Sequence, residues 1–328
     1  MRGILNVYKE KGYTSHDVVA KLRGICGMKK IGHTGTLDPD AAGVLPVCLG
    51  SATKVCSLLT DRDKTYEAVL LLGVRTDTLD TTGEVIEQID QDAVRALVTE
   101  EDVRRTAGQF TGVIDQIPPM YSARKVGGRK LCDLARAGIE VEREARKVTI
   151  HAIELLSVDL PRVRMRVRCS KGTYIRTLCD DIGTALGCGG CMESLLRLES
   201  AGFKLEDAHT LSEIEQMRQA GRLEEWLIPV DAVFSDLPGC QTLSGADKVL
   251  LNGGRLAASD LRSCGGEAPP GPREDTMTDR LSGDAGRNEP SGPREGDRIR
   301  VYASDGAFKA VYGYDAESKA YRPVKMFL

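Results

Sequence analysis

The sequence has no long apolar run. No segment reaches the roughly eighteen consecutive apolar residues that a membrane-spanning helix requires. Met1-Arg2-Gly3-Ile4 leads directly into a polar segment, so the hydrophobic stretch of a secretory signal is missing as well. These absences predict a soluble, cytoplasmic protein without a membrane partner.

Signatures of cofactors and metals are also missing from the sequence. The chain has neither the P-loop spacing Gly-x-x-x-x-Gly-Lys-Ser/Thr nor a Rossmann Gly-x-Gly-x-x-Gly fingerprint. Its ten cysteines are scattered along a chain without a targeting signal, which favours reduced, mostly buried thiols over disulfides. Cys188 and Cys191 form one close pair, but a zinc site needs two further ligands at similar spacing. We therefore expect no cofactor and no metal.

The net charge argues against a uniformly basic nucleic-acid-binding protein, because the 328 residues carry a formal charge of −3. The average conceals two basic blocks. Residues 1–60 contain 8 Lys and Arg against 4 Asp and Glu, and residues 120–180 contain 14 against 7. Positive charge concentrated in two stretches is the pattern expected where one face of a protein contacts a polyanion.

Glycine and proline dominate residues 32–46, which read Gly-His-Thr-Gly-Thr-Leu-Asp-Pro-Asp-Ala-Ala-Gly-Val-Leu-Pro. Three glycines and two prolines rule out a regular helix and predict a shaped loop. Asp38 lies between glycines and Pro39, so its carboxylate can be aimed with little reorganisation. Taken alone, an Asp-Pro pair is common at the start of a turn, so a turn with no role in chemistry is the alternative to a functional Asp38.

As a whole, the segment resembles the active-site loop of the bacterial tRNA pseudouridine-55 synthases, the TruB family. Two further motifs carry the same resemblance: Pro-Pro-x-Tyr-Ser-Ala-x-Lys at residues 118–125 and Lys-Gly-Thr-Tyr-Ile-Arg at residues 171–176. The resemblance implies that Asp38 is the catalytic residue and that Arg176 forms an ion pair with it. It also implies that Tyr66, in a Lys-x-Tyr motif, stacks on the substrate base.

The resemblance assigns RNA-binding roles to further residues. Residues 110–147 correspond to an insertion, called the thumb, that embraces the RNA. Leu195 matches an apolar residue that lines the pocket, and His33 would occupy the gap left by a flipped base. The remaining candidates for contact with RNA are Lys54, Tyr121, Lys125, Arg129, Lys130, Lys171 and Tyr174.

Periodicity and the resemblance together predict the fold class. Residues 1–236 are expected to form an α/β (α+β) pseudouridine-synthase core, with a mixed, largely antiparallel sheet flanked by helices. Residues 237–328 contain short strand patterns and turns, and resemble a small β-rich PUA-type RNA-binding domain. Residues 264–296 interrupt this domain with seven glycines and five prolines, and are predicted to be disordered.

The expected function is isomerisation of uridine 55 in the T-arm of tRNA to pseudouridine, by a monomer that needs no protein partner. Base flipping would bring the uridine to an aspartate that promotes cleavage of the glycosidic bond and rejoining through carbon. Three alternatives stay open at this point. They are a guide-RNA-dependent H/ACA-type synthase, a non-catalytic tRNA-binding or folding protein, and a zinc protein built on Cys188 and Cys191.

Overall fold

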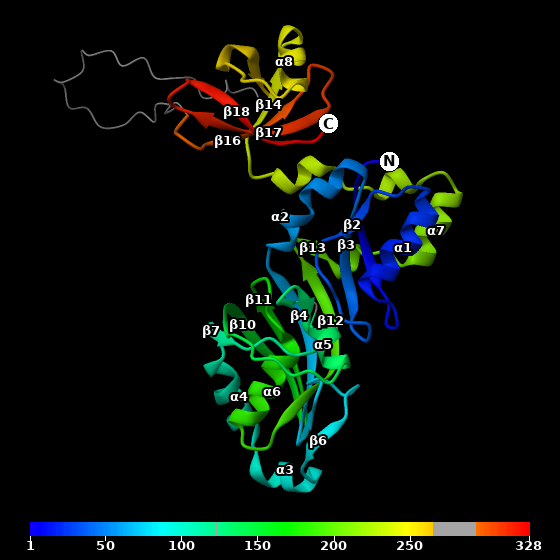
Figure 1. The fold of residues 1–328 in the computed structure, drawn as a ribbon, viewed down its shortest axis with the longest axis vertical. Helices are drawn as coiled ribbons and strands as arrows, with labels where there is room; N and C mark the ends of the chain where they lie inside the picture. The colour runs from blue at the N-terminus through cyan, green and yellow to red at the C-terminus, as the bar shows by residue number, and fades with distance from the viewer. Residues whose placement is uncertain (123, 265–292) are drawn as a thin grey trace, which may run out of the picture. The chain divides into compact units, whose positions relative to one another are not determined.

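The computed structural model describes residues 1–122, 124–264 and 293–328, without the side chains of Lys125 and Lys130. The insert predicted to be disordered, residues 264–296, falls almost wholly outside these ranges. The chain divides into two compact units (Figure 1). The larger unit comprises Leu5–Cys48 and Val55–Trp226, and the smaller one comprises Met1–Ile4, Leu49–Lys54 and Leu227–Leu328.

Nine strands of the described residues form the main sheet. Its central order is β1-β3-β12-β4-β11-β10-β7, with β2 paired to β3 and β13 paired to β12. The β3–β12 pair is parallel, whereas β12–β4, β4–β11, β11–β10 and β10–β7 are antiparallel, so the sheet is mixed and largely antiparallel as predicted. The strands are β1 (Gly3–Lys9), β2 (Ile31–His33), β3 (Ala42–Leu49), β4 (Lys64–Leu72), β7 (Gly112–Gln116), β10 (Arg146–Asp159), β11 (Arg162–Cys169), β12 (Gly190–Ser200) and β13 (Phe203–Lys204).

Strand β11 shows how the sequence builds the core. Its residues alternate between arginine and an apolar side chain, and the structure buries the apolar members while the arginines stay exposed. Arg164 and Arg166 form ion pairs with Glu67 and Glu154 on the adjacent strands β4 and β10, and Arg162 pairs with Glu193 on β12, one strand further. The buried face packs into a core shared with alternate residues of β4 and with helix α6 (Ile175–Ala185).

Helices begin where the sequence offers capping side chains. Thr14 and Asp17 form a capping box at α1 (Ser15–Cys26), and Thr99 and Asp102 form another at α4 (Glu100–Gln109). Helix α1 lies beside α7 (Leu211–Gln219) (Figure 1). The remaining elements of the larger unit are α2 (Cys56–Thr60), α3 (Gln91–Leu97), α5 (Leu131–Arg136), the hairpin β5 (Val74–Thr76) and β6 (Val85–Gln88), the hairpin β8 (Lys125–Val126) and β9 (Arg129–Lys130), and the 3-10 helices η2 (Leu205–Asp207) and η3 (Leu223–Trp226).

The smaller unit has a sheet and a core of its own. Strands in the order β15-β14-β16-β17-β18 form the sheet, and apolar residues of every one of these strands contribute to the core. This is the β-rich C-terminal module that the sequence predicts. Its elements are η4 (Val230–Phe234), β14 (Gly239–Thr242), η5 (Ser244–Ala246), α8 (Asp247–Leu251), η6 (Ala258–Asp260), β15 (Leu261–Ser263), β16 (Arg298–Tyr302), β17 (Phe308–Asp315) and β18 (Ala320–Met326), together with η1 (Gly50–Val55).

Over the described ranges, no helix combines the length and apolar character needed to cross a membrane.

Truncating a core leucine of β4 is expected to destabilise the larger unit. Leu70 is fully buried, so Leu70→Ala should lower the free energy of unfolding by about 2–5 kcal/mol in chemical denaturation followed by circular dichroism. Leu58 on α2 is 38% exposed, and Leu58→Ala should change the free energy by no more than about 0.5 kcal/mol. Equal losses from the two substitutions would contradict the placement of β4 in the core.

Candidate active site

The loop that carries Asp38 is shorter than the sequence suggests. Residues 34–41 form the connection, whereas residues 32 and 33 belong to β2 and residues 42–46 belong to β3, so the prediction of a loop over 32–46 is wrong at both ends. The strand continues there because β3 pairs in parallel with β12 at Gly43. Gly43 has φ of +111°, and a Cβ at this position would overlap the backbone of Arg197 on β12. The glycine therefore permits a close approach of the two strands.

Buried polar groups hold the loop on both sides of Asp38. The N–H of Leu37 donates a hydrogen bond to Ser15 Oγ at 2.9 Å, and Lys9 Nζ donates to the carbonyl of Pro39 at 3.1 Å. Lys9 is fully buried, and its burial lowers the pKa to about 8, although the nearby charge of Asp38 opposes this shift. Because both neighbours of Asp38 are held in this way, the direction of its carboxylate is fixed by the fold.

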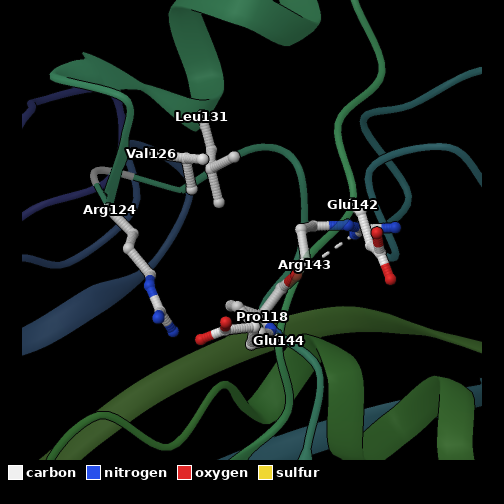
Figure 2. A pocket seen from close by; sticks show the side chains of 7 residues that line it. All are labelled: Pro118, Arg124, Val126, Leu131, Glu142, Arg143 and Glu144. Atoms are coloured by element: carbon white, nitrogen blue, oxygen red, sulfur yellow. Dashed lines mark hydrogen bonds between the residues drawn. The ribbon is translucent and has the colours of Figure 1, made fainter.

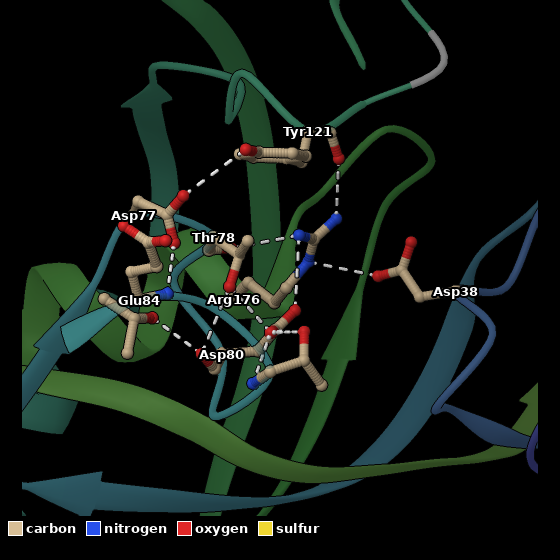
Figure 3. A network of polar contacts seen from close by, with 9 residues as sticks. Asp38, Asp77, Thr78, Asp80, Glu84, Tyr121 and Arg176 are labelled. Atoms are coloured by element: carbon tan, nitrogen blue, oxygen red, sulfur yellow. Dashed lines mark hydrogen bonds and ion pairs between the residues drawn. The ribbon is translucent and has the colours of Figure 1, made fainter. Parts of the chain in front are cut away.

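Arg176, in the first turn of α6, is the centre of the polar network (Figure 3). Its Nε atom lies 3.1 Å from Asp38 Oδ2, and its Nη1 atom lies 3.4 Å from Asp80 Oδ2. The guanidinium also donates to the backbone carbonyls of Thr78 at 3.0 Å and Tyr121 at 2.9 Å. The structure thus contains the ion pair between Asp38 and Arg176 that the resemblance implied.

Asp80 is the part of this network that the sequence did not reveal. Its side chain is 14% exposed, and Oδ1 accepts hydrogen bonds from Thr78 Oγ1 at 2.8 Å and from the N–H of Thr82 at 3.0 Å. These bonds leave Oδ2 facing Arg176. Residues 75–83 are rich in Thr and Asp, a composition typical of a solvent-exposed turn. The threonines around Asp80 are a local sign that its carboxylate could be held by hydrogen bonds, but they do not identify Arg176 as its partner.

The environment of Asp38 disfavours its charged form. Burial raises the pKa of the carboxyl above its usual value of 3.8, the charge of Arg176 opposes this shift, and the charge of Asp80 adds to it. Nevertheless the side chain is 40% exposed, in contrast to 6% for Arg176. Asp38 is therefore accessible from the cleft on one side and paired with a buried cation on the other.

Asp38 opens into a cleft of about 1070 Å³. Volumes of this size accommodate ligands as large as a nucleotide. Tyr66 and Leu195, which are 8% and 7% exposed, line the cleft from adjacent strands β4 and β12. Basic side chains supply part of the lining as well, namely Arg136, Arg146, Lys147 and Lys171. The cleft therefore combines an apolar and aromatic wall, a carboxylate and positive charge.

A second, smaller pocket of about 250 Å³ lies in the insertion (Figure 2). Arg143 Nη1 donates a hydrogen bond across it to the carbonyl of Pro118 at 3.1 Å. Its two arginines are matched by two glutamates, so the lining carries no excess charge. The lining residues are Pro118, Arg124, Val126, Leu131, Glu142, Arg143 and Glu144. The cleft beside Asp38 is the candidate active site.

Comparisons with known proteins identify the family. The family model described as TruB family pseudouridylate synthase (N terminal domain) matches residues 23–175, and the tRNA pseudouridylate synthase B C-terminal domain matches residues 176–235. A protein of Lachnoclostridium phytofermentans named tRNA pseudouridine synthase B is 51% identical over the full length of both chains. The chain belongs to the TruB family of pseudouridylate synthases. A second protein of that name, from Alkaliphilus oremlandii, is 46% identical over 80% of this chain and 85% of its own.

Solved structures show the same fold at lower identity. A chain of a Cbf5-Nop10-Gar1 complex matches 99% of this chain and 85% of its own, with a TM-score of 0.67 and 26% identity. A chain from an H/ACA RNP bound to a substrate RNA has a TM-score of 0.66 at 24% identity. The fold is therefore shared with H/ACA-type proteins, but the sequence is far closer to the bacterial TruB proteins, and the alternative functions are not favoured.

Of the residues that the TruB resemblance singled out, several lie together at the cleft. Tyr174 lines it, and its N–H donates to Gln116 Oε1 at 2.8 Å, which joins the start of α6 to the end of β7. Tyr121 also lines the cleft, and its hydroxyl donates to Asp77 Oδ2 at 3.3 Å. Lys171 lines it too.

Other TruB candidates lie elsewhere or are already paired. His33 is not among the described residues that line the cleft; its Nδ1 accepts a hydrogen bond from the N–H of Gly35 at 3.3 Å, and burial lowers its pKa. Lys171 forms an ion pair with Asp61 at 2.9 Å. Arg129 is exposed on β9, and Lys54 is exposed on η1 in the smaller unit. The predicted contacts of Lys125 and Lys130 lie outside the described side chains.

Within the parts of the chain that the structure covers, no group of three or more His, Cys, Asp or Glu side chains is arranged to hold a metal ion. Cys188 and Cys191 are both buried as free thiols.

The pKa of Asp38 is expected to respond in opposite directions to its two charged neighbours. Carbon-13 NMR of the aspartate carboxyl groups, assigned with Asp38→Asn, should show Asp38 titrating above the usual 3.8. Asp80→Asn removes a like charge and should lower the pKa of Asp38, whereas Arg176→Gln removes an opposite charge and should raise it. Shifts of the same sign in both variants would contradict this description of the site.

Proposed function

We propose that this protein converts uridine 55 in the T-arm of tRNA to pseudouridine. The observation that carries the proposal is the accessible Asp38 carboxylate, paired with buried Arg176 at the wall of a nucleotide-sized cleft. Membership of the TruB family, with relatives named tRNA pseudouridine synthase B, supports the choice of tRNA as substrate.

The reaction breaks the bond between N1 of uracil and C1′ of ribose, rotates the base, and joins C5 to C1′. The C5 proton leaves and N1 gains a proton, so no redox equivalent or nucleotide triphosphate is consumed. Attack on C1′, attack on the base and formation of a glycal all use one well-placed carboxylate. Asp38 serves this role only when ionised. Because its pKa is raised, the rate should fall on the acid side at a higher pH than for an ordinary aspartate.

A uridine within a folded tRNA arm reaches the cleft only after it leaves the stack of bases. Tyr66 and Leu195 then supply an aromatic platform and an apolar wall, and His33 fills the vacated place. The basic side chains that line the cleft fit the phosphates of the flanking nucleotides. Further contacts with the tRNA are assigned to Tyr121, Tyr174, Lys171, Arg129, Lys125, Lys130 and Lys54.

The proposed protein works alone, as a cytoplasmic monomer with no guide RNA or protein partner. Residues 1–236 form its catalytic domain, with the thumb at about 110–147, and residues 237–328 form a PUA-like domain that binds RNA. The closeness of the bacterial relatives supports independence from a guide. Incubation of pure protein with an unmodified tRNA transcript and no other macromolecule tests it: pseudouridine should form at position 55 and be absent from a transcript carrying cytidine there.

Replacing Asp38 with asparagine should abolish turnover without abolishing binding. Asp38→Asn keeps the shape of the side chain and removes its charge, so release of tritium from 5-tritiated uridine in a tRNA transcript should stop. The dissociation constant for the tRNA should stay within several-fold. Asp92→Asn, on an exposed side chain of α3, is the matched control and should release tritium at the normal rate. Retained turnover by Asp38→Asn would refute the assignment.

Arg176→Lys should lose most of the activity although the charge is kept. One ammonium cannot bond at once to Asp38, Asp80, and the carbonyls of Thr78 and Tyr121 in the geometry of the guanidinium fork. We expect the single-turnover rate on tRNA to fall by at least about 100-fold, since small misplacements of a catalytic group cost this much. A rate near that of the wild type would show that the network around Arg176 is not required.

A further inference from the structure

A second arginine lies beside the catalytic loop, and it has no acidic partner. Arg197 on β12 is 1% exposed and is among the largest fully buried side chains. Among the described residues, no carboxylate lies within ion-pair distance of it. Burying a guanidinium without an anion is costly, and such a group persists only where its hydrogen bonds hold something in place.

The bonds of Arg197 reach both ends of the Asp38 loop. Its Nε atom donates to the carbonyl of Val44 at 2.6 Å, and its Nη2 atom donates to the carbonyl of Gly35 at 3.2 Å. Gly35 precedes Asp38 and Val44 follows it. In addition, the backbone of Arg197 pairs in parallel with Gly43, whose lack of a side chain permits this approach. One residue thus bonds to the start of the loop and to the strand that follows it.

Arg197 is also the direct cross-strand partner of Tyr66. The two residues are opposite each other in the antiparallel β4–β12 pair, where side chains on the same face lie about 4.5–5.5 Å apart at Cβ. Burial raises the pKa of the Tyr66 phenol, and the charge of Arg197 opposes that shift. The arginine therefore lies opposite the aromatic platform of the cleft and bonds to the loop that carries the carboxylate.

We propose that Arg197 is a positioning residue of the active site, whose buried guanidinium bonds to the backbone on both sides of Asp38 and so fixes the loop relative to the neighbouring Tyr66. The proposal rests on the proposed function for its effect on turnover. It concerns geometry alone, because Arg197 does not need to touch the substrate.

Substitution of Arg197 should slow chemistry and leave binding of the tRNA unchanged. In Arg197→Met, which keeps an unbranched buried stem, the single-turnover rate on a tRNA transcript should fall roughly 100-fold, as expected for a misplaced catalytic group. The dissociation constant should stay within about threefold, since Arg197 lines the cleft with only 1% of its surface exposed. Arg222→Met, which removes an exposed arginine directly before η3, should have no effect on either.

Two measurements separate positioning from a general loss of structure. The first is a double-mutant cycle with Tyr66→Phe: the loss caused by Arg197→Met should be much smaller in the Tyr66→Phe background, because the two residues act together. The second is the phenol pKa of Tyr66, followed by NMR of carbon-13-labelled tyrosine without RNA. It should be higher in Arg197→Met than in the wild type.

The outcomes distinguish this proposal from the proposed function. A wild-type protein that is inactive on bare tRNA overturns the proposed function, yet a raised pKa of Tyr66 in Arg197→Met still supports the arrangement described here. Full turnover by folded Arg197→Met, or losses that simply add in the cycle, overturns the role of Arg197. If Arg197→Met does not fold, Arg197→Lys tests the proposal instead. A lysine keeps the charge but cannot donate to the carbonyls of Gly35 and Val44 together, so the turnover of this variant should fall at least about tenfold. Normal turnover of that variant overturns the proposal.

Discussion

The first turn of a helix is an unfavourable place for a cation, because the helix dipole is positive at that end. Arg176 occupies this position in α6 because acceptors from three separate segments surround its guanidinium. Asp38 comes from the loop between β2 and β3, Thr78 and Asp80 come from the turn after β5, and Tyr121 comes from the insertion. The remaining features of the site, namely the aimed carboxylate and the shaped cleft beside it, depend on these segments meeting at one point.

The fold keeps charged groups in places where their charge is costly. Lys9 and Lys64 are both buried, and burial lowers the pKa of each to about 8. Both bond to backbone carbonyls rather than to carboxylates, as Arg197 does. Such groups contribute little net stability, since desolvation offsets most of their hydrogen bonding. Their hydrogen bonds to backbone carbonyls around the Asp38 loop indicate that these groups fix the local geometry rather than add stability.

Much of the fold could be predicted from the sequence, because the patterns that specify helices and strands involve residues close together in the chain. The capping box at Thr14 and the alternation along β11 depend only on residues close together in the chain, and a helix and a strand form where these patterns occur. The Asp38 loop was found through its motif, but Pro46 was wrongly assigned to it, because only the distant strand β12 makes a strand of that segment. The roles of Asp80 and of the glutamates that pair with the arginines of β11 could not be predicted for the same reason. Their partners are set by strand order and register, which single residues do not reveal.

The hydrogen bond from Arg176 to the carbonyl of Tyr121 links the position of the insertion to the charge environment of Asp38. Tyr121 belongs to the insertion, yet this carbonyl accepts a hydrogen bond from the same guanidinium that binds Asp38. Any displacement of the insertion by an arriving nucleic acid therefore changes how that cation is solvated. A cation that loses one neutral acceptor interacts more strongly with the anions that remain. Displacement of the insertion and the electrostatic state of the Asp38 carboxylate are in this way linked through a single peptide group.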